Sequence, residues 1–126
     1  MILRTGIDLI EIGRVAAVIE RHGQHYLGRI YTPAELEQCG AHAESLAGRF
    51  AAKEAVAKAL GSGIGAVTWR EIEILGDEQN APVLRLYGRA QKNSKQLGLT
   101  EWSVSISHSE SHAIAVAVAI GDGTPA

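Results

Sequence analysis

The hydrophobic pattern of the chain changes period near its middle, and this change most limits the folds that the chain can adopt. In the first half, apolar residues recur at helical spacing, most clearly within residues 43–60. In the second half, residues 71–74 and 83–87 alternate between apolar and polar, as half-buried strands do. A strand, then helices, then mostly strands is the order typical of the α+β class. We therefore expect an antiparallel sheet with one long helix packed on it.

Local signals in the sequence predict where the elements begin and end. A strand is expected over residues 2–8, followed by a helix over 11–21 that ends near Gly23. Thr32-Pro33-Ala34-Glu35 predicts the start of a short helix, because threonine caps, proline suits the first turn and glutamate can reach back to the cap. The other expected elements are a helix over 89–97 and strands over 102–107 and 113–120.

Size and composition exclude several classes of protein. The 126 residues match one ordinary domain, so we expect a single domain over residues 1–126. Cys39 is the only cysteine, which excludes an internal disulfide and fits a reducing compartment. We expect neither a secretion signal nor a membrane span, because no apolar run approaches the roughly 20 residues that a span requires. We therefore expect a soluble cytoplasmic protein that binds no membrane. The net charge is −2, with acids and bases interspersed, which argues against nucleic-acid binding.

Asp8, Glu54 and Lys58 are the first candidates for chemistry. Asp8 ends the predicted first strand, where it could point into a cleft or could instead cap the following helix. Glu54 and Lys58 are four residues apart, so they are neighbours on one helix face and could form a simple solvated ion pair. However, two charges midway along an alanine-rich, buried helix require a further reason. Magnesium takes one or two carboxylates with waters and phosphates, and two acids beside a lysine match that demand.

Two other segments are candidates for phosphate contacts. Gly61-Ser62-Gly63-Ile64-Gly65 follows the long helix, and its glycines would let backbone N–H groups approach a phosphate, although a helix cap followed by a turn uses the same residues. Ser105 and Ser107 share one face of a predicted strand, and His108 falls at its end. A serine hydrolase is disfavoured, because the sequence has no G-x-S-x-G turn and no acid placed to orient the histidine.

The first predicted helix carries a basic face. Arg14 and Arg21 are seven residues apart, which is two helical turns, so they lie on the same side. Such a face is usually just solvated. It could also dock an acidic protein, because opposite charges speed the encounter of two proteins.

Three segments resemble those of holo-acyl-carrier-protein synthases, a family of 4'-phosphopantetheinyl transferases. They are Gly6-Ile-Asp8, then Gly48-Arg-Phe-Ala-Ala-Lys-Glu-Ala55 with Lys58 after it, and Val104-Ser-Ile-Ser-His108. The segments occur in order over nearly the whole chain, and the central one is the most specific. The resemblance implies the phosphopantetheinyl transferase fold and an enzyme of fatty acid biosynthesis. Such an enzyme transfers the 4'-phosphopantetheine arm of coenzyme A to a serine of apo acyl carrier protein and releases adenosine 3',5'-bisphosphate.

The resemblance also implies roles for individual residues. Asp8 and Glu54 would bind Mg²⁺ and act in catalysis together with Lys58, which would contact the pyrophosphate. Arg14 and Arg21 would bind the carrier protein. The family forms homotrimers with sites at subunit interfaces, so His108 could serve a neighbour's site. The residues that the resemblance places against coenzyme A are Arg49, Lys58, Gly61, Ser62, Gly63 and His108.

The expected mechanism is phosphoryl-type transfer, in which positioning and charge stabilisation supply most of the catalysis. The incoming serine must lose a proton, which Asp8 or Glu54 could accept directly or through water; we favour Asp8, because a strand end would place it nearer a cleft. Two alternatives stay open. A magnesium-dependent nucleotide phosphohydrolase would use the same acids without a protein acceptor. A non-catalytic module that binds a carrier protein or a nucleotide would leave Glu54 and Lys58 as a simple pair.

Overall fold

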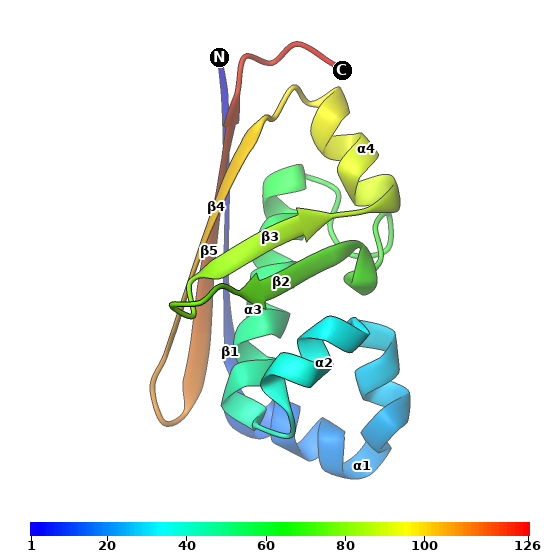
Figure 1. Ribbon diagram of the computed structural model, residues 1–126, viewed down its shortest axis with the longest axis vertical. Helices are drawn as coiled ribbons and strands as arrows, with labels where there is room; N and C mark the ends of the chain where they lie inside the picture. Colours follow the sequence, from blue (N-terminus) through cyan, green and yellow to red (C-terminus); the bar gives the residue numbers. More distant parts are fainter.

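The computed structural model describes all 126 residues, which form two antiparallel sheets and four α-helices (Figure 1). None of the helices combines the length and the apolar composition that crossing a membrane requires. A 3₁₀ turn over Trp69–Glu71 precedes the second strand. In chain order the other elements are β1 (Ile2–Glu11), α1 (Ile12–Ile30), α2 (Pro33–Cys39), α3 (Ala43–Leu60), β2 (Ile72–Gly76), β3 (Pro82–Leu86), α4 (Gly88–Gln96), β4 (Glu101–His108) and β5 (His112–Gly121).

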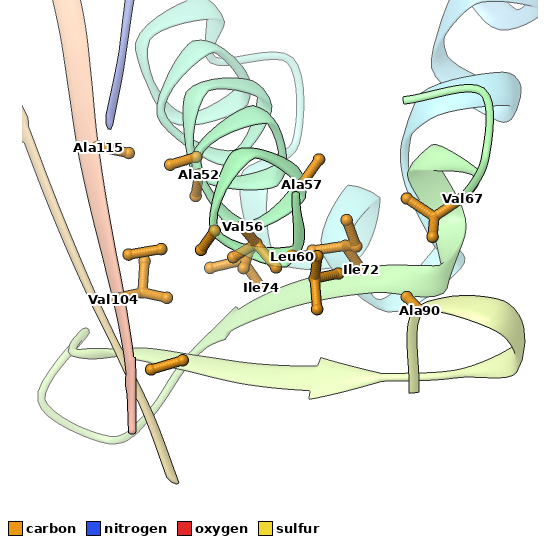
Figure 2. Close-up of a cluster of buried hydrophobic side chains, with 14 of the residues drawn as sticks. Ala52, Val56, Ala57, Leu60, Val67, Ile72, Ile74, Ala90, Val104 and Ala115 are labelled. Atoms are coloured by element: carbon orange, nitrogen blue, oxygen red, sulfur yellow. The ribbon is translucent and has the colours of Figure 1, made fainter. Parts of the chain in front are cut away.

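The larger sheet is built from the two ends of the chain. Its strand order is β1-β5-β4, and β5 runs antiparallel to both of its neighbours. The hairpin of β2 and β3 forms the second sheet, and it also packs against α3 (Figure 2). The structure thus confirms the expected α+β class and the antiparallel sheet that carries a long helix. The later strands and α4 lie close to the predicted ranges.

Small residues bring α3 close to the larger sheet. Gly6 of β1 faces the helix backbone, and a Cβ added there would lie 1.8 Å from the carbonyl oxygen of Ala55. No larger residue fits at this crossing, so strand and helix are almost in backbone contact. Arg4 and Asp8 flank Gly6 on the same face of β1 and therefore also point toward α3. On the hairpin side of the helix the core is filled by Val56, Leu60, Ile72 and Ile74 (Figure 2).

The side chains of β5 alternate between the two faces of the larger sheet. Its alanines at 113, 115, 117 and 119 are buried, and those from 115 onward belong to the core that includes α3. The alternate residues Ile114, Val116, Val118 and Ile120 point to the other face and are only half-buried. One half of the residues of β5 thus serves the core.

The boundary between β1 and α1 differs from the prediction. β1 continues to Glu11, because residues 9–11 keep pairing with the start of β5. Asp8 therefore lies inside the strand, opposite Ala115, and the prediction that it ends the strand is wrong. Asp8 does not cap α1 either, since the N-cap residue is Glu11. Helix α1 also continues past Gly23, where φ is +50° and ψ −127°, a conformation that glycine tolerates, so the helix kinks there and resumes.

The start of α2 confirms the prediction at Thr32. The Thr32 hydroxyl accepts a hydrogen bond from the Glu35 N–H (3.2 Å), and the Glu35 carboxylate accepts one from the Thr32 N–H (2.8 Å). Glu35 is fully buried, and its second oxygen accepts the N–H of Ile74 on β2 (2.8 Å). A residue predicted only to cap a short helix thus also attaches that helix to the hairpin.

Lys53 is the counter-charge of Glu35 and is fully buried in the middle of α3. Its Nζ donates to Glu35 Oε1 (2.8 Å), to the carbonyl oxygen of Trp69 (3.0 Å) and to that of Ile72. Burial lowers the pKa of Lys53, and the charge of Glu35 opposes this shift. All three ammonium N–H groups are satisfied, so the pair fastens α2, α3 and β2 to one another.

We predict that Lys53→Met will lower the free energy of unfolding by about 3–5 kcal/mol, because it leaves the Glu35 carboxylate buried without its partner. Denaturant unfolding followed by circular dichroism measures this, with Lys92→Met on the exposed side of α4 as the control. Adding Glu35→Gln to Lys53→Met should cost less than the sum of the two single substitutions. Equal effects of Lys53→Met and Lys92→Met would contradict the prediction.

Candidate functional site

Asp8, Glu54 and Lys58 come together where β1 crosses α3. Lys58 Nζ donates to Asp8 Oδ1 (3.3 Å) and to the carbonyl oxygen of Ile7 (2.8 Å). Glu54 lies one helical turn before Lys58 on the same side of α3. The ion pair that Lys58 forms is with Asp8 rather than with Glu54, so the simple helix pair considered from the sequence is not the observed arrangement.

The two carboxylates repel each other. Burial raises the pKa of Glu54, the nearby charge of Asp8 raises it further, and Lys58 opposes the shift in part. Both acids line one cavity of about 350 Å³. Lys58 is paired with Asp8, whereas Glu54 belongs to none of the three ion pairs. A cation bound beside both acids would relieve their repulsion.

This donor set fits a magnesium ion better than a metal that needs a closed protein cage. Nowhere in the structure do three or more histidine, cysteine, aspartate or glutamate side chains gather at one point. Magnesium typically keeps several waters and takes only one or two carboxylates beside substrate phosphates. Asp8 and Glu54 could supply those two carboxylates, and the open cavity leaves the other positions to water and substrate oxygens.

The walls of this cavity come from β1, α1 and α3. Arg14 lines it, so α1 brings one of the two predicted docking arginines to the acids, while Arg21 is exposed further along the helix. Phe50 also lines it and stacks on Trp69, with ring centroids 4.7 Å apart. The sequence analysis missed Phe50 as a site residue, although it lies one helical turn before Glu54. The other apolar walls are Leu9, Ile10, Val15, Val18 and Tyr26.

Arg49 and His108 lie in a different cavity, of about 500 Å³, that shares no lining residue with the first. Arg49 and Glu54 are five residues apart on α3 and therefore face about 140° away from each other. Arg49 Nη2 donates to Gln38 Oε1 (3.3 Å), but the buried Arg49 Nε has no partner. Because buried N–H groups are rarely left unpaired, a water molecule or a ligand atom is the expected partner of this one. Gln38, Asp77 and Asn80 also line the cavity, and no spacing in the sequence pointed to them.

The glycine segment after α3 forms a tight cap. Gly61 has φ +77° and its N–H bonds the carbonyl oxygen of Lys58 (3.0 Å), while the Gly63 N–H bonds that of Ala57 (3.3 Å). The cap suggested by the sequence is therefore present. In addition, the hydroxyl oxygen of Ser62 is buried without a hydrogen-bond partner. The segment thus offers an unsatisfied polar group near Lys58, as a ligand site would.

Comparison with known proteins decides the family. Residues 4–117 match the model of the 4'-phosphopantetheinyl transferase superfamily. The chain belongs to this superfamily. The matched residues include every candidate residue named above, from Asp8 to His108.

Individual relatives of this phosphopantetheinyl transferase agree with the match. A holo-[acyl-carrier-protein] synthase of Herpetosiphon aurantiacus is 52% identical over 112 residues, which cover 83% of this chain and 88% of that protein. The crystal structure of Helicobacter pylori holo-[acyl-carrier-protein] synthase in complex with coenzyme A has a TM-score of 0.85 at 35% identity and covers 92% of this chain and 99% of that one. A Chronobacterium ammoniagenes complex with coenzyme A has a TM-score of 0.84 at 30% identity and covers 97% and 99%.

We predict that Glu54→Gln will stabilise the transferase at neutral pH without divalent cations, because it removes a charge that burial and Asp8 disfavour. The folded state holds the Glu54 proton to higher pH than the unfolded state does. The free energy of unfolding of the wild type should therefore fall as pH rises from the ordinary value of 4.5 through the raised pKa. Urea unfolding of the wild type and of Glu54→Gln at a series of pH values from 4.5 to 8 measures the difference in their free energies of unfolding.

The control for this experiment is Glu37→Gln on the exposed side of α2. It should leave the pH dependence of unfolding as in the wild type. If Glu54→Gln and Glu37→Gln gave the same pH profile, the raised pKa of Glu54 that burial and Asp8 cause would be contradicted.

Proposed function

We infer that this protein is a holo-acyl-carrier-protein synthase, which transfers the 4'-phosphopantetheine arm of coenzyme A to a serine of apo acyl carrier protein. The other product is adenosine 3',5'-bisphosphate, and the reaction serves fatty acid biosynthesis. The observation that carries this proposal is the cavity shared by Asp8 and Glu54, with Lys58 bound to Asp8, in a chain 52% identical to a synthase of this name. A phosphohydrolase or a non-catalytic module would explain the two acids in one cavity, but it would not explain the high identity to a holo-acyl-carrier-protein synthase.

Asp8 and Glu54 are proposed to hold Mg²⁺. Bound there, the ion would neutralise charge that develops on the pyrophosphate oxygens as the bond to the leaving nucleotide breaks. Lys58 supports the same oxygens: its Nζ uses two N–H groups on Asp8 and Ile7, and the third is free for a phosphate. Since Lys58 is half exposed, it can reach a ligand without losing its contact with β1.

The serine hydroxyl of the carrier protein must lose a proton as it attacks. The reason for favouring Asp8 as the acceptor was a position at a strand end, and Asp8 does not have that position. Both acids line the same cavity, so Asp8 or Glu54, directly or through a water molecule, accepts the proton in the proposed mechanism.

The nucleotide of coenzyme A is proposed to bind the groups that the fold leaves without partners. Arg49 Nε and the Ser62 hydroxyl are both buried and unpaired, and phosphate oxygens would accept their hydrogen bonds. His108 is exposed at the end of β4, in the same cavity as Arg49. The full set of proposed coenzyme A contacts is Arg49, Lys58, Gly61, Ser62, Gly63 and His108.

Two observations support a homotrimer with sites at subunit interfaces. First, Lys58 and the acids lie apart from Arg49 and His108 within one copy, so one coenzyme A would meet both sets if the second came from a neighbouring copy. Second, the face of the larger sheet opposite α3 carries no helix (Figure 1) and is apolar. Leu3, Ile7 and Leu9 of β1 are all more than half exposed there, beside the outward residues of β5. Contiguous exposed apolar surface of this kind marks an association site.

Arg14 and Arg21 are proposed to dock the carrier protein. Both are exposed on α1, and Arg14 also borders the cavity of the acids. A carrier protein held by these arginines would present its serine close to the pyrophosphate. Opposite charges on the two surfaces would guide the encounter.

The decisive experiment for the activity is to incubate the protein with coenzyme A, Mg²⁺ and apo acyl carrier protein and then to weigh the carrier. We expect a gain of about 340 Da, the mass of the transferred arm on serine. The gain should disappear without Mg²⁺ and fall sharply in Asp8→Asn but not in the exposed control Asp122→Asn. Cleavage of coenzyme A without a mass gain would indicate the phosphohydrolase. Coenzyme A binding that is indifferent to Mg²⁺, without cleavage, would indicate the binding module.

The same assay tests the docking arginines. Arg14→Ala should raise the KM for the carrier protein and leave the KM for coenzyme A unchanged, because it removes a charge from α1 and not from the nucleotide contacts. Arg70→Ala, also exposed but outside α1, should change neither constant. A lower affinity of Arg14→Ala for coenzyme A with an unchanged carrier KM would overturn the assignment.

The oligomer is tested by light scattering coupled to size exclusion. We expect three times the mass of one chain for the wild type and dissociation for Leu3→Glu, because a charge on the outward face of β1 disfavours burial against a second copy. Val83→Glu places the same charge on another exposed apolar residue, on β3, and should stay trimeric. A monomeric wild type with full transfer activity would contradict the shared-site proposal.

A further inference from the structure

Arg4 is a charged residue on the inward face of β1 that none of the roles above uses. It precedes Gly6 by two positions, so its side chain lies toward the C-terminal end of α3 on the same strand face as Asp8. Arg4 Nε donates to the carbonyl oxygen of Ala59 (2.9 Å), one of the last carbonyls of the helix. The contact joins residues 55 positions apart in the chain, so it is set by the fold and not by local sequence.

The charge of Arg4 has no acidic partner. None of the three ion pairs in the structure includes Arg4. Its side chain makes one hydrogen bond to the protein, the bond from Nε to the carbonyl oxygen of Ala59. The C-terminal end of a helix carries a partial negative charge, so a guanidinium is favourable there. The four N–H groups on the two terminal nitrogens remain without a protein acceptor, and they lie beside the segment that follows α3.

Arg4 also packs directly over that segment. A Cβ added to Gly61 would lie 2.5 Å from Arg4 Nη2, so the guanidinium occupies the space above this glycine. Gly61 is in the left-handed region, and the next residue is Ser62 with its buried, unpaired hydroxyl. Arg4 thus holds the last turn of α3 through Ala59 and covers the turn that leaves it. These two contacts fix the direction in which Gly61, Ser62 and Gly63 leave the helix.

We propose that Arg4 is a positioning residue for coenzyme A, which holds the turn Gly61-Ser62-Gly63 so that the Ser62 hydroxyl faces the phosphates of the substrate. The proposal rests on the proposed function, because it assigns a role within the same coenzyme A site. Arg4 acts through the turn: without it, the end of α3 and the turn would sample other conformations, and binding the substrate would first have to order them. The carrier-docking surface on α1 and the acids at the crossing of β1 and α3 would not change.

The test compares Arg4→Met with Arg85→Met, which removes an exposed arginine of β3 that contacts neither the end of α3 nor this turn by a hydrogen bond or an ion pair. Arg4→Met should raise the KM for coenzyme A about tenfold, as expected from the loss of one hydrogen bond from a charged group, with kcat and the KM for the carrier protein unchanged. Arg85→Met should behave as the wild type. An unchanged KM for coenzyme A in Arg4→Met would overturn the proposal. So would equal losses in all constants together with a lower melting temperature, since these indicate a general loss of structure.

A double-mutant cycle with Gly61→Ala tests whether Arg4 acts through the turn. Gly61→Ala places a Cβ against Arg4 Nη2 and should also raise the KM for coenzyme A. If Arg4 acts through Gly61, the effects of Arg4→Met and Gly61→Ala on the KM for coenzyme A will not add. The reason is that Arg4→Met removes the guanidinium with which the Cβ added by Gly61→Ala would collide. Additive effects would overturn the proposal. A wild type that adds no mass to the carrier protein would instead refute the proposed function, so the two failures are distinguishable.

Discussion

The buried pair of Lys53 and Glu35 is the interaction on which the arrangement of the other elements depends. An ion pair without solvent contact adds little stability by itself, but neither charge tolerates the loss of its partner. The ammonium also donates to the carbonyl oxygen of Trp69, just before β2, and to that of Ile72, the first residue of β2. The carboxylate accepts the N–H groups of Thr32 and Ile74. The pair therefore admits only one placement of α2 and the hairpin on α3. The half-buried neighbour of Lys53 on the helix, Glu54, is thereby directed about 100° away, toward β1.

The candidate site follows from this placement and from one glycine. With the hairpin fixed on one side of α3, the larger sheet covers the other, and Gly6 lets β1 approach until Lys58 can reach Asp8. The two carboxylates then share a cavity although burial and the neighbouring charge of Asp8 both raise the pKa of Glu54 and so disfavour its charged form. Functional sites commonly keep such unfavourable pairs because a ligand relieves them, and the surrounding structure holds the groups in place meanwhile.

The sequence predicted the fold class, the long helix, the capping of α2 and the hairpin, because each depends on local periodicity or on a cap of a few residues. It also placed Asp8, Glu54 and Lys58 together through motif order. It did not predict the end of β1, which is set by pairing with β5 far along the chain. Nor could spacing show that Lys53, rather than Glu54 or Lys58, is the fully buried charge, or that Arg4 contacts Ala59. These are contacts between distant segments, for which a single sequence carries no local signal.

The close approach at Gly6 has a consequence for how securely the acid is placed. Within a strand, side chains alternate between two faces, so a shift of one residue in the pairing of β1 with β5 would turn Asp8 outward and Ile7 inward. At the crossing with α3 such a shift would also replace Gly6 by a residue with a Cβ, for which there is no space against the Ala55 carbonyl. The absence of a side chain at one position therefore enforces the register of a ten-residue strand, and with it the orientation of the carboxylate two residues away.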